Sequence, residues 1–274
     1  MQAIPTFPTV LASGLAMGES PRWHEGKLWL SDWGAREIVV LNEDGQREQT
    51  IPVPFELPFC FDWLHDARLT VVAGREARIV CLEADGSWST YADLSVISAS
   101  PWNEIAVDRS GNTYINNAEA IALVTPEGQV YKVGDGGKFP NGMAITADNR
   151  TLLMAESHGR CITAFTITPN GSVANRRTWA AVDGPPDGIC LDAEEALWYA
   201  DVPNKRCVHI REGGEILETI QLDRGCFSCA LGGSTGHTLF VVATEWRGME
   251  KAAEVAAQRT GQVIAVRVNT PALT

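Results

Sequence analysis

The sequence predicts an all-β fold, a six-bladed β-propeller of four-stranded blades, and three observations support it. A unit of polar residue, short alternating strand, polar turn and second strand occurs six times, and two of the copies, those that begin at Cys60 and Phe227, are degenerate. The first positions of these units lie 38 to 46 residues apart, and they are Glu19, Cys60, Asn103, Asn141, Asp187 and Phe227. A glycine-containing turn recurs every 41 to 43 residues, at Gly45, Gly86, Gly128, Gly171 and Gly213. A period of about 40 residues with several strands per period is typical of propellers.

Each repeat continues beyond its first hairpin with two further strands. The third strands are predicted at residues 37–41, 78–82, 120–124, 161–167, 206–210 and 262–268. The more polar fourth strands follow the glycine turns, at residues 47–53, 87–92, 129–133, 177–182 and 215–222. The sixth repeat has no fourth strand of its own, so we expect residues 9–16 to pair beside residues 262–268 and close the ring. The Ala- and Glu-rich run 249–258 predicts a short helix.

Composition excludes several classes of partner. All-β folds of 274 residues are often single domains, so one domain is expected over residues 1–274. The net charge of −12 argues against binding to nucleic acid or to an anionic membrane. No apolar run is long enough to span a membrane, and residues 1–9 lack the basic and apolar parts of a signal peptide.

The seven cysteines, odd in number and irregular in spacing, favour a reducing cytoplasm over a disulfide framework. Cys226 and Cys229 form a C-x-x-C pair that opens an apolar strand without a partner pair elsewhere. We therefore expect buried thiols there rather than a redox or zinc site.

The first strand of each propeller blade lines the central channel, so equivalent positions at its start form a ring. Four of the six positions bear side-chain oxygens: Glu19, Asn103, Asn141 and Asp187. Two carboxylates and two amides that converge in a mostly apolar interior need a cation to balance them. Hard oxygen ligands favour Ca²⁺, Mg²⁺ or Mn²⁺ over a structural zinc. The alternative is that each residue caps local backbone groups, which is the better interpretation for any one alone.

Three segments resemble the hallmark segments of one enzyme family, and the similarity extends across essentially the whole chain. The segments are residues 19–23 (ESPRW), 140–144 (PNGMA) and 186–192 (PDGICLD). They resemble those of the gluconolactonase/senescence-marker-protein/luciferin-regenerating-enzyme family. The resemblance implies a six-bladed propeller with one catalytic divalent metal ion, calcium first, with magnesium, manganese and zinc as other candidates. It implies that Glu19, Asn141 and Asp187 are the protein ligands. Asp187 would also act as general base or orient the attacking water, and Asn103 would be a further ligand or a substrate contact.

One segment departs from the family pattern. Sugar-lactone members usually carry Arg-x-Asn-Asp at the third repeat, where this chain has Pro101-Trp102-Asn103-Glu104. Loss of that arginine argues against an aldonolactone substrate but not against lactone hydrolysis. The substrate-binding candidates are Asn103, Trp102, Glu104, Phe139 and Phe227. With Trp246, the aromatic members would suit a less polar ester or lactone, and the alternative role for each is packing between blades.

The function predicted is metal-dependent hydrolysis of a small-molecule lactone to the hydroxy acid. The cation would polarise the carbonyl, and water activated by the metal or by Asp187 would attack it. No G-x-S-x-G segment is present, and the five histidines share no motif. Two alternatives stay open: an organophosphate hydrolase with Asp187 as nucleophile, and a non-catalytic propeller with structural calcium. The sequence leaves the oligomeric state undefined.

Overall fold

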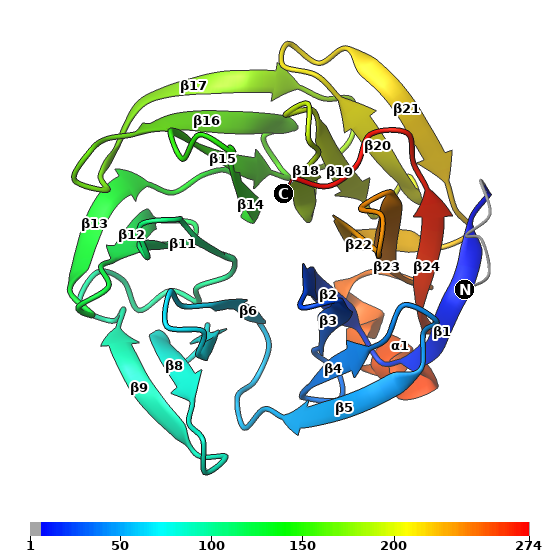
Figure 1. The fold of residues 1–274 in the computed structure, drawn as a ribbon, viewed down its shortest axis with the longest axis horizontal. Helices are drawn as coiled ribbons and strands as arrows, with labels where there is room; N and C mark the ends of the chain where they lie inside the picture. The colour runs from blue at the N-terminus through cyan, green and yellow to red at the C-terminus, as the bar shows by residue number, and fades with distance from the viewer. Residues whose placement is uncertain (1–6, 274) are drawn as a thin grey trace. The chain divides into compact units, whose positions relative to one another are not determined.

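The structure, a computed structural model, describes residues 7–273. Contacts divide the chain into two compact units, one formed by the residues up to Pro54 together with those from Val182 onward, and the other by Phe55–Ala181. Each unit holds three four-stranded sheets in which every pair of neighbouring strands is antiparallel (Figure 1).

The first unit contains one sheet from the start of the chain and two from its last third. The first sheet has the order β2 (Gly18–His24), β3 (Lys27–Asp32), β4 (Glu37–Leu41), β5 (Arg47–Pro52). The second has the order β18 (Ile189–Leu191), β19 (Leu197–Asp201), β20 (Arg206–Ile210), β21 (Ile216–Gln221). The third has the order β22 (Gly225–Gly232), β23 (Thr238–Thr244), β24 (Gly261–Arg267), β1 (Thr9–Leu15).

The third sheet confirms the predicted pairing of the two ends of the chain. Strand β1 pairs with β24, with Thr9 opposite Ala265 and Leu15 opposite Gly261. The first strand therefore supplies the fourth strand that the last repeat lacks. The predicted helix is also present, as a 3₁₀ turn η1 (Met249–Lys251) followed by α1 (Ala252–Gln258).

The second unit contains the three middle sheets. They are β6 (Phe59–Trp63), β7 (Leu69–Ala73), β8 (Arg78–Leu82), β9 (Trp88–Asp93); then β10 (Ile105–Val107), β11 (Thr113–Asn116), β12 (Ala120–Val124), β13 (Val130–Asp135); then β14 (Pro140–Ile145), β15 (Thr151–Glu156), β16 (Cys161–Ile167), β17 (Val173–Ala181). In each sheet the strands lie in the order of the sequence.

Six four-stranded antiparallel sheets make the fold a six-bladed β-propeller, as predicted. The largest boundary difference is β17, which begins at Val173 rather than at residue 177. Two register shifts along its pairing with β16, and a positive φ of 51° at Asn175, let the strand continue through residues that read as a turn. The single domain over residues 1–274 stays a prediction, and its outermost residues, 1–6 and 274, lie outside the described part.

The glycine turns between third and fourth strands are confirmed by their backbone conformation. Each of the five glycines has a φ in the left-handed region, namely 81° at Gly45, 83° at Gly86, 78° at Gly128, 79° at Gly171 and 91° at Gly213. A side chain is strained at such φ values, which explains why the same residue recurs at each turn.

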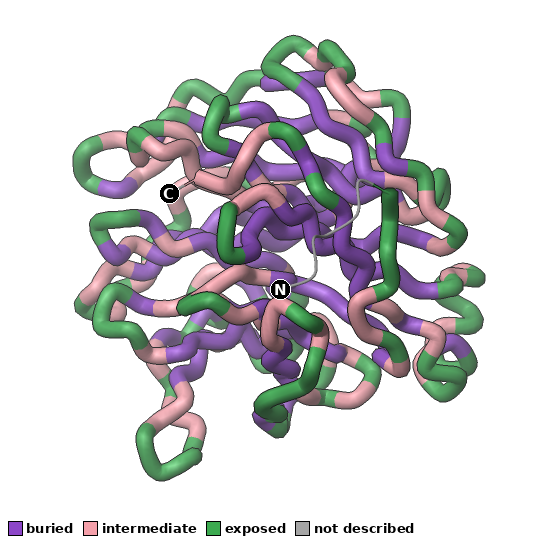
Figure 2. Tube along the Cα trace, turned by 45° about the vertical axis from the view of Figure 1, so that its right-hand side comes forward, coloured by how far each residue is buried: buried purple, intermediate pink, exposed green. Residues whose placement is uncertain are grey.

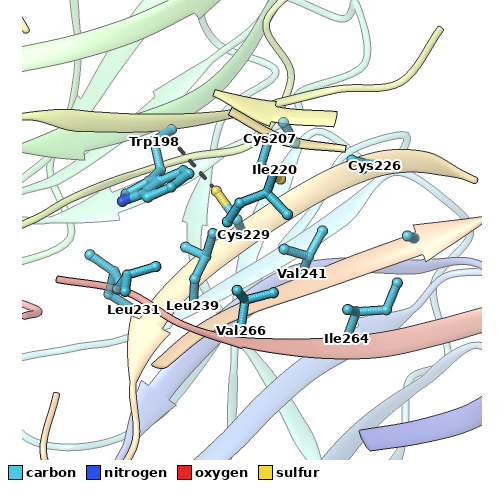
Figure 3. Packing of buried hydrophobic residues seen from close by; sticks show 13 residues of the cluster. Trp198, Cys207, Ile220, Cys226, Cys229, Leu231, Leu239, Val241, Ile264 and Val266 are labelled. Carbon is cyan, nitrogen blue, oxygen red and sulfur yellow. Dashed lines mark hydrogen bonds between the residues drawn. The ribbon is translucent and has the colours of Figure 1, made fainter. Parts of the chain in front are cut away.

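The first three strands of each sheet are buried along most of their length, and the exposed residues gather at turns and on the fourth strands (Figure 2). One apolar cluster in the first unit joins β19 and β20 to β22, β23 and β24 (Figure 3). Cys207, Cys226 and Cys229 belong to it, and the Cys229 thiol donates to the Trp198 carbonyl at 3.8 Å. Hydrogen bonding with Cys229, together with burial, raises the pKa of the Cys190 thiol well above its ordinary value. Cys226 and Cys229, the C-x-x-C pair, are thus buried thiols of an apolar core, as predicted.

All seven cysteines are free thiols. Among residues 7–273, no helix has the length and apolar character needed to cross a membrane.

Candidate active site

Glu19 lies near the start of β2 and is buried. It faces Ser31 on β3, and a bulge follows, because Arg22 is the next residue of β2 with a partner in register. Such bulges re-aim side chains beside functional sites. The backbone N–H of Ser20 donates to Glu19 Oε2 at 2.7 Å, which fixes one carboxylate oxygen.

Ser20, which follows Glu19, has an unusual backbone. Its φ is 48° although it precedes Pro21, and a non-glycine residue in the left-handed region costs about 1–3 kcal/mol. Such strain is typical of functional sites. Ser20 follows Glu19 in the chain and Ser31 is opposite it on β3, and the buried hydroxyls of both have no hydrogen-bond partner among the described residues. Unsatisfied buried polar atoms beside a carboxylate mark a place for water or an ion.

Asp187 lies just before β18 in the same unit and is half-buried. Its backbone N–H donates to the Ala200 carbonyl at 2.9 Å, and the N–H of Gly188 donates to the Phe227 carbonyl at 2.9 Å. Gly188 lies directly against Ser228: a Cβ at this glycine would be 1.9 Å from Ser228 Oγ. The absence of a side chain therefore lets the Asp187 segment lie close to β22.

Phe227 is the predicted substrate contact of the first unit. Strand β22, which carries it, packs against both β2 and β18, the elements that position Glu19 and Asp187. The Phe227 ring meets the Trp246 ring edge-on, with centroids 5.3 Å apart. Both rings belong to one apolar cluster, so Phe227 has a packing role whatever else it contacts.

Asn103 and Asn141, from neighbouring sheets of the second unit, are brought together. Asn103 Nδ2 donates to Asn141 Oδ1 at 3.2 Å and to the Pro140 carbonyl at 3.2 Å. Asn116 Nδ2 donates to the Asn141 carbonyl at 2.7 Å, and Asn141 Nδ2 reaches Ser157 Oγ at 3.4 Å. Strand β14 also bulges here, between Pro140 and Met143. The two amides thus form one connected group.

Trp102 and Glu104, which flank Asn103, are both buried. Trp102 has no exposed surface, and its indole N–H donates to the Ser98 carbonyl at 3.2 Å. Because the ring has no exposed surface, it could contact a substrate only after moving out of this buried position. Glu104 Oε1 accepts the N–H of Ile105 at 2.9 Å, and the Glu104 N–H donates to Asn116 Oδ1 at 3.1 Å.

Phe139, two residues before Asn141, is the predicted contact with the most exposed ring. Its side chain is 55% exposed, and its φ is 60° although Pro140 follows. The ring stacks on His158, with centroids 4.5 Å apart. A strained, exposed aromatic residue beside a polar group is a stronger indication of function than an exposed apolar residue alone.

The donor groups fit a hard divalent cation by their chemistry. Carboxylate and amide oxygens are the ligands that Ca²⁺ and Mg²⁺ prefer. Within residues 7–273, no three His, Cys, Asp or Glu side chains come together in a way that could hold a metal ion. The predicted ligand set contains two carboxylates, Glu19 and Asp187, and one amide, Asn141.

Sequence reasoning missed a set of buried carboxylates in the three sheets that carry the predicted ligands. Asp32, Glu156 and Asp201 each end the second strand of a sheet and are buried. Each is followed four residues later by a basic residue: Arg36, Arg160 and Lys205. This spacing, present in three repeats, was the available signal.

A family model described as "SMP-30/Gluconolactonase/LRE-like region" matches residues 17–245. The chain belongs to this family. The matched span contains Glu19, Asn103, Asn141 and Asp187, so every oxygen-bearing position of the predicted ring lies within it.

Two relatives and one solved structure illustrate the family similarity. The chain is 25% identical to a 6-deoxy-6-sulfogluconolactonase of Pseudomonas putida, over 97% of this chain and 96% of that protein. It is 30% identical to a regucalcin of Xenopus laevis, over 85% of each chain. A regucalcin structure from Agrobacterium tumefaciens, described as a calcium-binding protein, superposes with a TM-score of 0.81 at 17% identity, covering 100% of this chain and 97% of that one. This structural similarity shows the fold.

Proposed function

We propose that the protein is a divalent-metal-dependent lactonase that opens a small-molecule lactone to its hydroxy acid. The observation that carries the proposal is the family match across residues 17–245, which includes all three proposed ligands. A relative named as a sugar-acid lactonase that aligns over nearly the whole chain supports the reaction class. The calcium-binding description of a structural relative supports calcium as the cation.

Glu19, Asn141 and Asp187 are the proposed ligands. Two carboxylates would balance the double positive charge, and the amide would add a neutral oxygen. The strained backbone at Ser20 and Phe139 supports a ligand role for the adjoining segments, because such conformations gather at functional sites. When bound, the cation would polarise the lactone carbonyl and stabilise the negative charge that develops on its oxygen.

Asp187 is the proposed general base. Its segment is fixed by two backbone hydrogen bonds, from Asp187 to Ala200 and from Gly188 to Phe227. The carboxylate takes a proton from water as the water oxygen bonds to the carbonyl carbon. The ring C–O bond then breaks, and the departing oxygen takes the proton from Asp187, becomes the hydroxyl of the product and leaves the carboxylate as it was at the start. No covalent enzyme intermediate is required.

Asn103 is the proposed substrate contact that hydrogen-bonds one of the proposed ligands, Asn141. The Asn103 amide nitrogen donates to Asn141 Oδ1 and to the Pro140 carbonyl. These two hydrogen bonds set the orientation of the Asn103 amide before a substrate binds. A preoriented amide supports binding because little freedom is lost on association. Phe139 offers an apolar face two residues away along the chain from Asn141.

The test is a hydrolysis assay with a pH indicator on a panel of sugar and non-sugar lactones, with calcium, magnesium or manganese and with chelator. We expect turnover of at least one lactone, loss of turnover with chelator and recovery with excess cation. Asp187→Asn should abolish turnover while the far-ultraviolet circular dichroism stays unchanged. Turnover that persists unaltered in the chelator or in Asp187→Asn contradicts the proposal, and turnover of a phosphotriester alone would favour the organophosphate alternative.

The predicted cytoplasmic location is supported by the seven free thiols. A fraction-by-fraction immunoblot of the cells that make the protein would test it.

A further inference from the structure

The second strands of the six sheets end in residues of two different kinds. In the sheets of Glu19, Asn141 and Asp187 the last residue is a carboxylate, namely Asp32, Glu156 and Asp201. In the other three sheets the last residue is Ala73, Asn116 or Thr244. A buried carboxylate is costly unless it is paired and hydrogen-bonded, so its recurrence beside each proposed ligand calls for an explanation.

Asp32 holds the backbone that leads into Glu19. Its Oδ2 accepts the N–H of Ala16 at 2.9 Å, and its Oδ1 accepts the N–H of Met17 at 2.8 Å. Arg259, which follows helix α1, places Nη2 3.7 Å from Asp32 Oδ2 and donates from Nε to the Gly14 carbonyl at 2.7 Å. The two residues fix the segment just before β2.

Glu156 holds the segment that leads into Asn141. Its Oε2 accepts the N–H of Lys138 at 2.8 Å, while its Oε1 accepts from Thr163 Oγ1 and from Arg176 Nη2, both at 2.6 Å. The same guanidinium donates to the Gly136 carbonyl at 3.0 Å. A Cβ on Gly137 would lie 2.8 Å from the carboxylate carbon, so the backbone passes directly over Glu156.

Asp201 does the same for the segment before Asp187. Its Oδ2 accepts from Arg206 Nε at 2.9 Å, and Arg206 Nη2 donates to Asp183 Oδ1 at 2.6 Å. Gly184 lies against the carboxylate, since a Cβ there would be 2.1 Å from Asp201 Oδ2. Asp183 and Gly184 belong to the segment that precedes Asp187, and these contacts hold them against the end of β19. We call the segment that precedes each proposed ligand its lead-in segment.

We propose that Asp32, Glu156 and Asp201 are positioning residues that hold Glu19, Asn141 and Asp187 in the geometry that binds the cation. The inference rests on the proposed function and extends it to three residues that touch neither the cation nor the substrate. Asp32 and Glu156 accept backbone N–H groups of the segment before the ligand. Asp201 acts instead through Arg206, which also binds the Asp183 carboxylate, and through its contact with Gly184. Each carboxylate lies beside an arginine: Arg259, Arg176 or Arg206. Residues that orient metal ligands typically contribute about 10- to 100-fold to metal affinity.

Asp192 provides a matched control. It is a fully buried aspartate that accepts the N–H groups of Glu194 at 2.8 Å and Ala196 at 3.0 Å and pairs with His209 Nε2 at 2.7 Å. It lies at the turn after β18, whereas Asp187 precedes this strand. Asp192→Asn therefore disturbs a similar buried network without touching a lead-in segment.

The experiment compares Asp32→Asn, Glu156→Gln, Asp201→Asn and Asp192→Asn by calcium titration calorimetry at a temperature where all four are folded. We expect calcium to bind about 10- to 100-fold more weakly to the first three and within about twofold of wild type to Asp192→Asn. Raised calcium should restore much of the lactone turnover of the three positioning variants. Arg176→Met, which changes a half-exposed residue, gives a second test should Glu156→Gln not fold, with the same direction of change.

Calcium affinities of the three variants that match Asp192→Asn would overturn the proposal. Should the wild-type chain neither bind a divalent cation nor hydrolyse a lactone, the proposed function fails. Hydrogen exchange at the Lys138 amide then separates the two ideas. Faster exchange in Glu156→Gln but not in Asp192→Asn shows that the carboxylate holds the segment, and equal exchange rules that out.

Discussion

The Phe139 ring lies on the imidazole of His158, with centroids 4.5 Å apart and planes 27° apart. The two residues come from opposite sides of the β14–β15 hairpin, where Ser157 N–H donates to the Phe139 carbonyl and His158 N–H donates to the Lys138 carbonyl, both at 3.0 Å. Phe139 is thereby held in a strained conformation with more than half of its side chain exposed. A substrate with an apolar face would find a ring fixed by stacking, two residues before Asn141 in the chain.

Phe139→Ala is expected to raise KM for apolar lactones and to leave kcat nearly unchanged. A stacking contact contributes about 0.5–1.5 kcal/mol, which corresponds to about a 2- to 10-fold change in KM. A contact made equally in the ground state and the transition state changes KM alone. Steady-state kinetics on one sugar lactone and one aryl-substituted lactone measure the effect.

Tyr131→Ala is the matched control for Phe139→Ala, since Tyr131 is an aromatic residue of β13 that is 49% exposed. It should leave KM unaltered. Equal changes in the two variants, or a fall in kcat alone for Phe139→Ala, would argue against the proposed contact.

Gly188→Ala is expected to lower the free energy of unfolding by about 1–3 kcal/mol, the usual cost of forcing extra volume into a packed site. The new Cβ would lie 1.9 Å from Ser228 Oγ and 2.6 Å from Ser228 Cα, so side-chain rotation alone cannot relieve the clash. Adding Ser228→Gly should recover part of the loss. Urea denaturation of the single and double variants measures both effects.

Gly134→Ala serves as the control for Gly188→Ala, because its new Cβ would meet only side-chain atoms, the nearest being 3.1 Å away on Val173. Its stability should stay within about 1 kcal/mol of wild type. Equal losses in the two variants would mean that the Gly188–Ser228 contact is looser than it is in the structure.

Glu156 is expected to make stability fall at acid pH. Burial acts to raise the pKa of its carboxyl, but the donors from Thr163, Lys138 and Arg176 outweigh it and hold the pKa below the ordinary value of 4.5. A lowered folded-state pKa gives stability that is present above the unfolded-state value and is lost as pH falls through the folded-state value. The window is therefore the acid range below the ordinary value.

Urea midpoints at pH 7, 5, 4 and 3 test this expectation. Wild type should lose more stability than Glu156→Gln between pH 5 and pH 3, because the glutamine does not titrate. Parallel pH profiles would show that Glu156 has the same pKa in the folded and unfolded chains.

The fold was predictable because its signals are local. Gly45 and its four equivalents mark turns that only glycine enters without strain, and they repeat more regularly than the strands they separate. The pairing of β1 with β24 followed from one missing strand and one unassigned segment. Strand β17 started earlier than predicted because bulges let a strand run through polar residues.

The site was less predictable because its contacts depend on distant residues. Asn103 and Asn141 could be paired by their repeat positions, but Arg259 and Arg176 could not be assigned to Asp32 and Glu156. These arginines lie outside the regular spacing of the repeat. Trp102 illustrates another limit. The sequence shows an aromatic residue next to a site residue, but it does not show whether the ring is exposed or, as the structure has it, buried.

The neighbouring first and last strands also determine how the first unit responds to mechanical load. Thr9 lies opposite Ala265, so the beginning of β1 and the end of β24 are at the same end of an antiparallel pair. A force that separates these two points breaks the hydrogen bonds between β1 and β24 one after another. It does not load all of them at once, as a shearing force would. The first unit should therefore yield at low force when it is pulled at Thr9 and Arg267, and β1 should then separate before any other strand of its sheet.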